Sequence, residues 1–387
     1  MKKKFKLLQA VMLMTTLFIG YGCSSENDPI PIPQESQSSL DGNKVMQVLV
    51  NFAKNTNAET KSNINTFNIK ELTKETLNFN LSSKQSRSAD INEVPNKTSI
   101  DLYTVIFERN GSKGYSILTA DDRLESVYAF TEYGELSDTI ENKTLGEIIR
   151  LIPEMCKTDI ENFYTQPMPR ESIWDTRLRK IGPLITSKMD TKWPYNKLFP
   201  IVTGTTDRPE FNNHYTSNTT AVAIAQMLCV YGPKGVISIS TPTEDELASK
   251  FRFVAYDSDP QGRHWAQYMD GVTYHLLSAC KYFDKAGFKY EYKKAQKHTD
   301  DKKVFNSLFK NGMPVIMENF VEPRTWIISG IECEYYVDSN ELDLIRSLHC
   351  NWGLNGKSDG WYGNWLRPAH HSYNYTTNDI LYFQRAF

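Results

Sequence analysis

Cysteine is the residue type in this chain that most readily supplies a nucleophile or a soft metal ligand. Five cysteines follow Cys23, at positions 156, 229, 280, 333 and 350, and they form no CxxC pair and stand beside no matched histidine cluster. The pattern therefore predicts no metal site, no redox motif and no cofactor. Most of these thiols stand in apolar stretches such as Met227-Leu228-Cys229-Val230, which predicts buried, inert side chains.

The composition indicates a folded protein whose positive and negative side chains nearly balance. The chain has 387 residues, of which 40% are hydrophobic and 12% aromatic, enough for two packed domains. Lys and Arg (44) nearly balance Asp and Glu (46), so the net charge is -2. Without a basic field, the sequence gives no indication of a nucleic-acid partner.

An export signal opens the chain at residues 1–22. Four lysines among the first six residues precede an apolar run from Leu7 to Tyr21, which is too short for a permanent membrane span. Because a small residue directly before a cysteine ends a lipoprotein signal, Cys23 is predicted to be the mature first residue and to carry the lipid. The alternative is an ordinary secretory signal with a chance cysteine, since Gly20 stands where such signals usually carry leucine.

This signal predicts an exported protein that is lipid-anchored to the outer membrane, on the periplasmic face or at the cell surface. Glu26 and Asp28 favour surface export of the kind that Bacteroidetes lipoproteins show. Residues 23–41 contain three prolines and many polar side chains, a composition typical of an extended tether.

A smaller α+β domain is predicted over residues 42–164. Apolar residues at 45, 48, 49 and 52 have the spacing of a helix face, whereas the polar stretch 55–100 predicts loops. Strand-like runs at 102–107 and 115–118 flank Asn110-Gly111, a hairpin turn signal, and 127–130 reads as a third strand. A further helix repeats its apolar residues from Leu145 to Ile152, where Pro153 should interrupt it.

Residues 165–183 are predicted to be a connector, and residues 184–387 to be a second domain that is denser in aromatic and apolar residues. Several stretches of this second domain resemble, in order, landmarks of the streptopain-like cysteine peptidases. They are PLITSKMDTKWPYNKLFP at 183–200, SNTTAVAIAQML at 217–228, NGMPVIM at 311–317, RTWIISGI at 324–331 and HCNWGLNGKSDGWY at 349–362. GYSILTADDRLESVYAF at 114–130 is similar to the family's amino-terminal propeptide, which is akin to streptopain inhibitors.

The resemblance implies a papain-like peptidase domain preceded by a propeptide-like domain. It also places Thr219 at the family's nucleophilic cysteine, Arg324 at the catalytic histidine and Ser329 at the family's Asp. Thr191 falls where the family has the glutamine that helps to form the oxyanion hole. Arginine is always protonated near neutral pH, so Arg324 cannot act as a base, and the site is predicted to be degenerate.

Other residues do not restore the enzyme. Cys229 lies ten residues after Thr219, about 15 Å along a helix axis. Thr219 as a nucleophile would need an adjacent base, so its interpretation as part of a helix start, capped by Ser217 or Asn218, is preferred. His349 shares a strand face with Asn351 and has two interpretations, a substitute base or a structural residue.

Two further landmark residues are assigned structural roles. Trp352 either shields an active-site hydrogen bond or packs in the core, and packing is preferred because the histidine is replaced. Asn351 is expected to bond Arg324 instead of that histidine.

Two functions fit these residues. The first is a non-catalytic binding or inhibitory pseudopeptidase that holds a peptide or protein ligand in the old groove. The alternative is an active endopeptidase of the cysteine-peptidase family with an unusual site. The chemistry of Thr219 and Arg324 favours the first.

We expect the protein to fractionate with membranes through the lipid on Cys23. The substitution Cys23→Ser should move most of the protein into the soluble fraction, because it removes the lipidated thiol while leaving the tether intact. Membrane fractionation and mass spectrometry of the mature amino terminus measure both outcomes. A wild-type protein that is already soluble and begins at another residue would contradict the anchor.

Overall fold

A computed structural model describes most of the chain between Gln37 and Gln384. The chain divides into a first unit, Met1–Leu40, and a second unit, Asp41–Phe387, which holds everything below except the first turn of α1. Cys23, the export signal and the tether up to residue 36 lie outside the described residues. The described stretches are 37–56, 67–81, 95–165, 176–199, 201, 212–214, 219–232, 245–246, 248–249, 252, 276–296, 300–319, 324–363 and 378–384.

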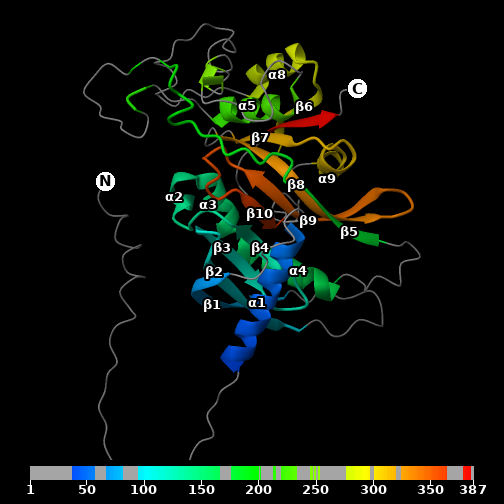
Figure 1. The fold of residues 1–387 in the computed structure, drawn as a ribbon. Helices are drawn as coiled ribbons and strands as arrows, with labels where there is room; N and C mark the ends of the chain where they lie inside the picture. Colours follow the sequence, from blue (N-terminus) through cyan, green and yellow to red (C-terminus); the bar gives the residue numbers. More distant parts are fainter. Residues whose placement is uncertain are drawn as a thin grey trace, which may run out of the picture. The chain divides into compact units, whose positions relative to one another are not determined.

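The first helix follows the apolar spacing of the sequence. Helix α1 spans Gln37–Thr56, and its buried residues Val45, Leu49 and Ala53 repeat at helical intervals (Figure 1). They pack with aromatic and apolar side chains of the strands that follow. The predicted helix is therefore confirmed.

The prediction of loops over residues 55–100 is wrong in part, because strand β1 spans Asn68–Asn80 and pairs along its length with β2, Lys97–Arg109. β1 lies at the edge of the sheet, and most of its side chains are exposed on both faces. A strand that is solvent-exposed on both faces shows no alternation of apolar and polar residues. The sequence therefore carries no period-two pattern that would indicate this strand.

The predicted hairpin is confirmed. Strand β2 turns into β3, Ser112–Thr119, through Asn110 and Gly111, which both have positive φ as a two-residue turn requires. Strand β4, Val127–Thr131, pairs with β3. Helices α2, Asp138–Glu141, α3, Lys143–Arg150, and α4, Ile152–Thr165, follow, and the helix is interrupted at Leu151, directly before Ile152 and Pro153, as expected.

The remaining elements come from the carboxyl-terminal half. Their bounds are β5 Thr176–Ile181, α5 Thr219–Tyr231, α8 Leu276–Lys285, β6 Lys289–Gln296, α9 Asp301–Phe305, a π-helical turn Asn306–Lys310, β7 Val315–Asn319, β8 Arg324–Tyr336, β9 Glu341–Asn351, β10 Gly360–Gly363 and β11 Asn378–Gln384.

All described strand pairs are antiparallel, and they form one sheet in the order β1-β2-β3-β4-β10-β9-β8-β7-β11-β6. The two predicted domains meet inside this sheet, where β4 pairs with β10 through Thr131↔Gly360, Phe130↔Trp361 and Ala129↔Tyr362. Strand β5 lies off this path and pairs with β8. The stretch predicted to be a connector therefore contributes a strand to the sheet. Helices with one antiparallel sheet confirm the α+β class.

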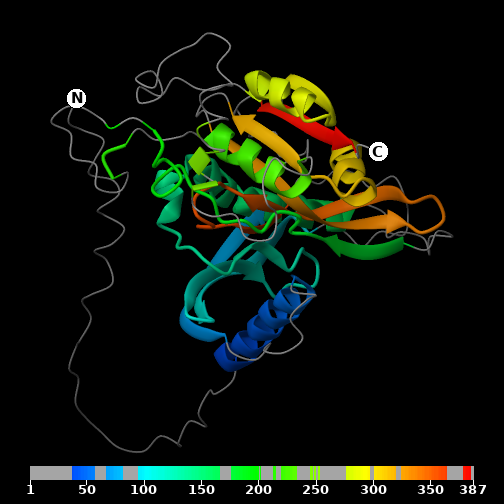
Figure 2. The same ribbon diagram turned by 45° about the horizontal axis from the view of Figure 1, so that its top comes forward.

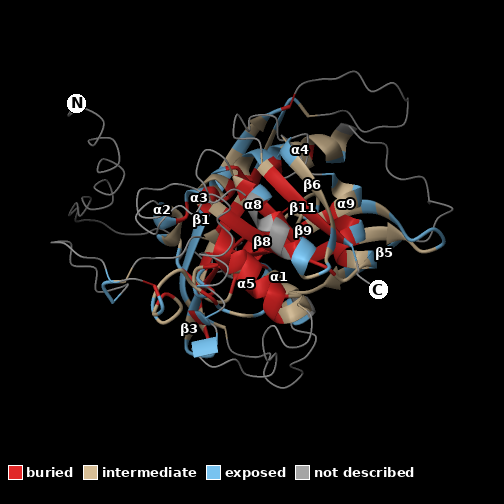
Figure 3. Cartoon of the chain, turned by 90° about the horizontal axis from the view of Figure 1, so that it is seen from above, coloured by how far each residue is buried: buried red, intermediate tan, exposed pale blue. Residues whose placement is uncertain are grey.

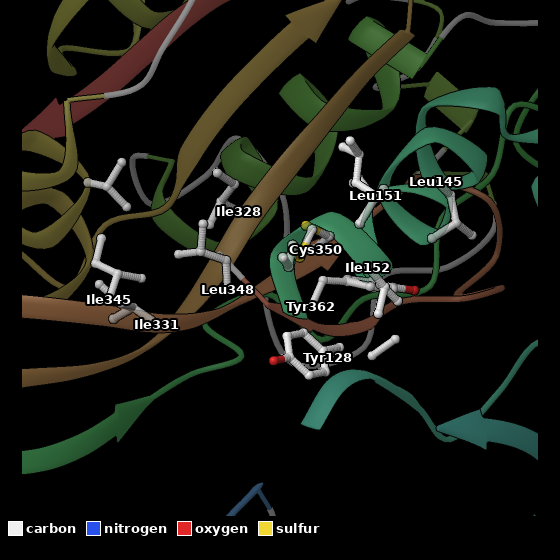
Figure 4. Packing of buried hydrophobic residues seen from close by; sticks show 14 of the residues in the cluster. Tyr128, Leu145, Leu151, Ile152, Ile328, Ile331, Ile345, Leu348, Cys350 and Tyr362 are labelled. Carbon is white, nitrogen blue, oxygen red and sulfur yellow. The ribbon is translucent and has the colours of Figure 1, made fainter. Parts of the chain in front are cut away.

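Side chains alternate between the two faces of the sheet and build separate cores. On one face, α3 and α4 cover a cluster that includes Ile328, Leu348, Cys350 and Tyr362 (Figure 4). On the other face, α1 packs over β2, β3, β4 and Trp361, while α5 and α8 pack over β7, β8 and β11 (Figures 1 and 2). Neighbouring Trp361 and Tyr362 thus serve opposite cores.

None of the helices in the described ranges is long and apolar enough to span a membrane.

We expect Gly353→Ala to destabilise the fold by about 2–4 kcal/mol. Gly353 has a φ of +67°, and an added Cβ would lie 2.9 Å from Val222 of α5, so backbone strain and overpacking both act. Gly287→Ala is the matched control, since its φ is +75° but its added Cβ would have no neighbour within 4 Å. Urea unfolding measures both variants, and equal losses would contradict the role of the α5 contact.

Candidate active site

The start of α5 carries the position that the resemblance assigns to a nucleophile. Thr219 is the first residue of the helix, and its Oγ1 accepts a hydrogen bond of 2.9 Å from the backbone N–H of Thr325 in β8. The hydroxyl of Thr220 bonds that of Thr325 at 2.6 Å. The helix start and the strand start are therefore joined by threonine hydroxyls. The predicted caps Ser217 and Asn218 lie outside the described residues.

Helix α5 is a buried central element. Every residue from Thr220 to Cys229 is buried, so most of the helix is red in Figure 3. A helix that is apolar on all sides belongs in a core. Thr219, the first residue of the helix, is partly exposed, as are Val230 and Tyr231 at its other end.

Arg324, at the first position of β8, turns toward the amino-terminal part of the chain. Its guanidinium donates a hydrogen bond of 3.1 Å to the backbone carbonyl of Glu141, at the end of α2. The half-buried side chain therefore bridges β8 and the amino-terminal half of the sheet and its helices. A histidine at this position would not reach as far with a permanent positive charge.

Asn351 has other partners than the expected Arg324. Its Oδ1 accepts from Gln226 Nε2 at 3.2 Å and from Gly353 N at 3.1 Å, and its Nδ2 donates to the Ser187 carbonyl at 3.2 Å. Gln226 lies seven residues after Thr219, about 10 Å along the helix axis. The structure thus brings Thr219 beside the start of β8 but holds Asn351 further along α5.

Trp352 packs in the core, as preferred from the sequence. It is fully buried, lies between the rings of Trp326 and Tyr362, and donates its Nε1–H to the Ser358 carbonyl. Gly353 follows because α5 approaches the backbone closely there. The Asn-Trp-Gly landmark is therefore a segment against which the central helix α5 packs.

Thr191 bonds locally. Its backbone N–H and its hydroxyl both donate to the carboxylate of the preceding Asp190, at 2.6 and 3.3 Å. Both contacts lie within the segment that follows β5.

His349 and Ser329 form a buried pair that the sequence did not indicate. The Ser329 hydroxyl and His349 Nδ1 are 2.7 Å apart, on neighbouring strands at a bulge in β8. Burial, with the nearby Lys180 ammonium, lowers the pKa of His349 to about 3. The imidazole is therefore neutral and a weak base, which agrees with a structural role.

The five cysteines after Cys23 are all buried. Burial raises the pKa of Cys156 and of Cys333 to about 12 and that of Cys280 to about 11. These thiols are protonated at neutral pH and are poor nucleophiles. No group of three or more potential metal ligands occurs within the described ranges.

Asp359 and Lys188 were missed by sequence reasoning, although they line a cavity of about 270 Å³ with His349 and Trp361. Burial raises the pKa of Asp359 to about 7, against the lowering effects of the Trp352 amide and Lys188. The cavity forms where three distant segments meet, so no local motif marks it.

Comparison with known proteins addresses the resemblance directly. Residues 254–362 match the family model of the Peptidase C10 family, the streptopain family. The predicted family resemblance is confirmed. The matched streptopain-family segment includes Arg324, Ser329, Asn351 and Trp352, whereas Thr191 and Thr219 precede it.

One solved structure is similar over much of the chain. Fragment 39–359 of prointerpain A from Prevotella intermedia, solved as a mutant, is 18% identical, with 72% of this chain and 94% of that chain covered and a TM-score of 0.43. No curated protein sequence matches the chain.

We expect His349 to weaken the fold under acid. Because its folded pKa is about 3, below the ordinary 6.5, the unfolded chain binds a proton that the folded chain resists between these values. Stability linked to His349 is therefore present above pH 6.5 and lost as the pH falls toward 3, by up to about 1.4 kcal/mol per pH unit.

The matched variant is His349→Gln, which keeps a polar partner for Ser329 but does not titrate. Unfolding free energies of both proteins from pH 7 to pH 4 give the difference, in which the common carboxylates cancel. A difference that does not change with pH would show that His349 binds protons equally in the folded and the unfolded chain, as an exposed imidazole does.

Proposed function

We propose that this protein is a non-catalytic member of the streptopain type that binds a peptide or protein without cutting it. The observation that carries the proposal is the start of α5, where Thr219 accepts a hydrogen bond from Thr325 and Arg324 is the adjacent strand residue. A threonine hydroxyl needs a neighbouring base to attack, and an arginine cannot provide one.

Glu318 is a further candidate base among the described residues, since it lies directly opposite Thr325, whose backbone N–H bonds Thr219. Its carboxylate accepts the Leu276 amide at 2.7 Å, and burial raises its pKa to about 8. A carboxyl group with this pKa is mostly protonated at neutral pH. This argues against the alternative, an active endopeptidase with an unusual site.

The bond from Arg324 to Glu141 supports an inhibitory arrangement, in which the propeptide-like region stays over the former catalytic position. A chain without a nucleophile does not remove this region by cutting itself. The ligand would then bind beside a retained propeptide-like domain. We further propose that the lipid anchor on Cys23 holds the protein at the outer membrane, facing the periplasm or the cell surface.

Repair of the site tests the loss of catalysis. The double variant Thr219→Cys with Arg324→His should react with a thiol-directed peptidase probe at the new cysteine, because a thiolate and its base are restored together. Thr219→Cys alone should react about 100- to 10,000-fold more slowly, the usual contribution of a positioned base. The readout is labelling rate, with the modified residue identified by peptide mapping.

The matched control is Thr220→Cys with Arg324→His, one residue further along α5, where the side chain is buried and should not react. The parent should stay unlabelled, because Cys229 is buried, and should remain at full mature length on storage. The proposal fails if the parent hydrolyses a general protease substrate and Thr219→Ala abolishes this activity.

A further inference from the structure

A pocket lies on the face of the sheet that carries α1 and α5, between the core clusters of these two helices. Its walls come from the end of β4, from the segment after β5 and from the turn into β10, and its volume is about 270 Å³. We call it the junction pocket and define it by Phe130, Ile185, Lys188, His349, Asp359 and Trp361. A cavity of about 150 Å³ holds benzene, so this one has room for a small organic molecule.

Two opposite charges face this pocket without pairing. One oxygen of Asp359 accepts the Trp352 amide at 2.8 Å, and its other oxygen forms no hydrogen bond with any part of the chain that the structure describes. The ammonium of Lys188 lies 5.3 Å from the centre of the Tyr133 ring and, within the same described part, forms no ion pair within 4 Å, although its charge lowers the pKa of Asp359. Each charge is therefore available to a ligand.

The rest of the lining is apolar or already bonded. Phe130, Ile185 and Trp361 supply apolar wall, and the Glu132 carboxylate at the rim is paired with Arg109. His349 presents a neutral imidazole whose Nδ1 contacts Ser329. The pocket thus offers one cation, one acid and an apolar wall.

These features select among ligand classes. A simple cation would suit Asp359 but would face Lys188, and a simple anion would suit Lys188 but would face Asp359. A zwitterion satisfies both groups, and an apolar substituent fills the wall between them. We propose that the junction pocket binds a small zwitterion with an apolar side chain, namely a free apolar amino acid.

In this arrangement the ligand carboxylate pairs with Lys188 and the ligand ammonium with Asp359. Because the ammonium favours the ionised form of a carboxyl group whose pKa is about 7, binding below pH 7 releases a proton. Affinity should therefore rise as the pH increases from 6 to 8, while the ligand ammonium stays charged. The site is independent of Thr219 and of the proposed pseudopeptidase function.

Titration calorimetry on the purified full-length protein tests this with three related probes. L-leucine carries both charges, N-acetyl-L-leucine lacks the ammonium, and L-leucinamide lacks the carboxylate. L-leucine should bind at least about tenfold more tightly than either other probe, since each lost charge removes a charge-assisted hydrogen bond.

Variants assign the two charges. Lys188→Met should weaken L-leucine binding at least about tenfold and remove its advantage over L-leucinamide, and Asp359→Asn should remove its advantage over N-acetyl-L-leucine. Lys357→Met is the matched control, because this nearby exposed lysine pairs with Asp138 at 3.5 Å and does not line the pocket. Its binding should equal that of the wild type.

Thr186→Trp provides a test that leaves the buried residues untouched, since Thr186 is an exposed lining residue and a bulky ring there should fill the pocket and block binding. The proposal is overturned by no binding of L-leucine at about 10 mM. It is equally overturned if either single-charge probe binds as well as L-leucine, or if Lys188→Met and Thr186→Trp leave binding unchanged.

Discussion

The pairing of β4 with β10 is the interaction on which the rest of the structure depends. Three residue pairs between β4 and β10 join the strands of the amino-terminal half to those of the carboxyl-terminal half. We call this pairing the seam, and the other strands of the sheet lie on either side of it. Trp361 and Tyr362 in β10 point to opposite faces and enter different cores. One short strand therefore couples main-chain hydrogen bonding to the burial of two aromatic side chains.

The seam also positions residues of the pocket and of the candidate active site. It sets Asp359 and Trp361 beside His349, and it brings α2 near the start of β8, where Arg324 reaches Glu141. In an active peptidase, a propeptide must leave the groove. Here Arg324 has a partner at the end of α2, so its guanidinium contributes to the contact between the two halves of the sheet.

The sequence predicted the features that depend on local periodicity. Helix α1 and the turn at Asn110-Gly111 carry complete local signals, and both form where expected. Strand β1 was not predicted because it is solvent-exposed on both faces. Ser329 and His349 meet only through a bulge between two strands, and two of the three partners of Asn351 are residues 125 and 164 positions away. Such contacts depend on register and packing, which residue spacing does not encode.

Strand β5 has a consequence for any cut made between Thr165 and Thr176. β5 pairs with β8 and would stay with the carboxyl-terminal fragment, while β1 to β4 would remain attached through β10. Breaking one peptide bond would thus yield a nicked complex of two chains that share a sheet. Release of the amino-terminal piece would require the hydrogen bonds between β4 and β10 to break, which would expose two sheet edges. Proteolysis alone would therefore cut the chain without separating its two halves.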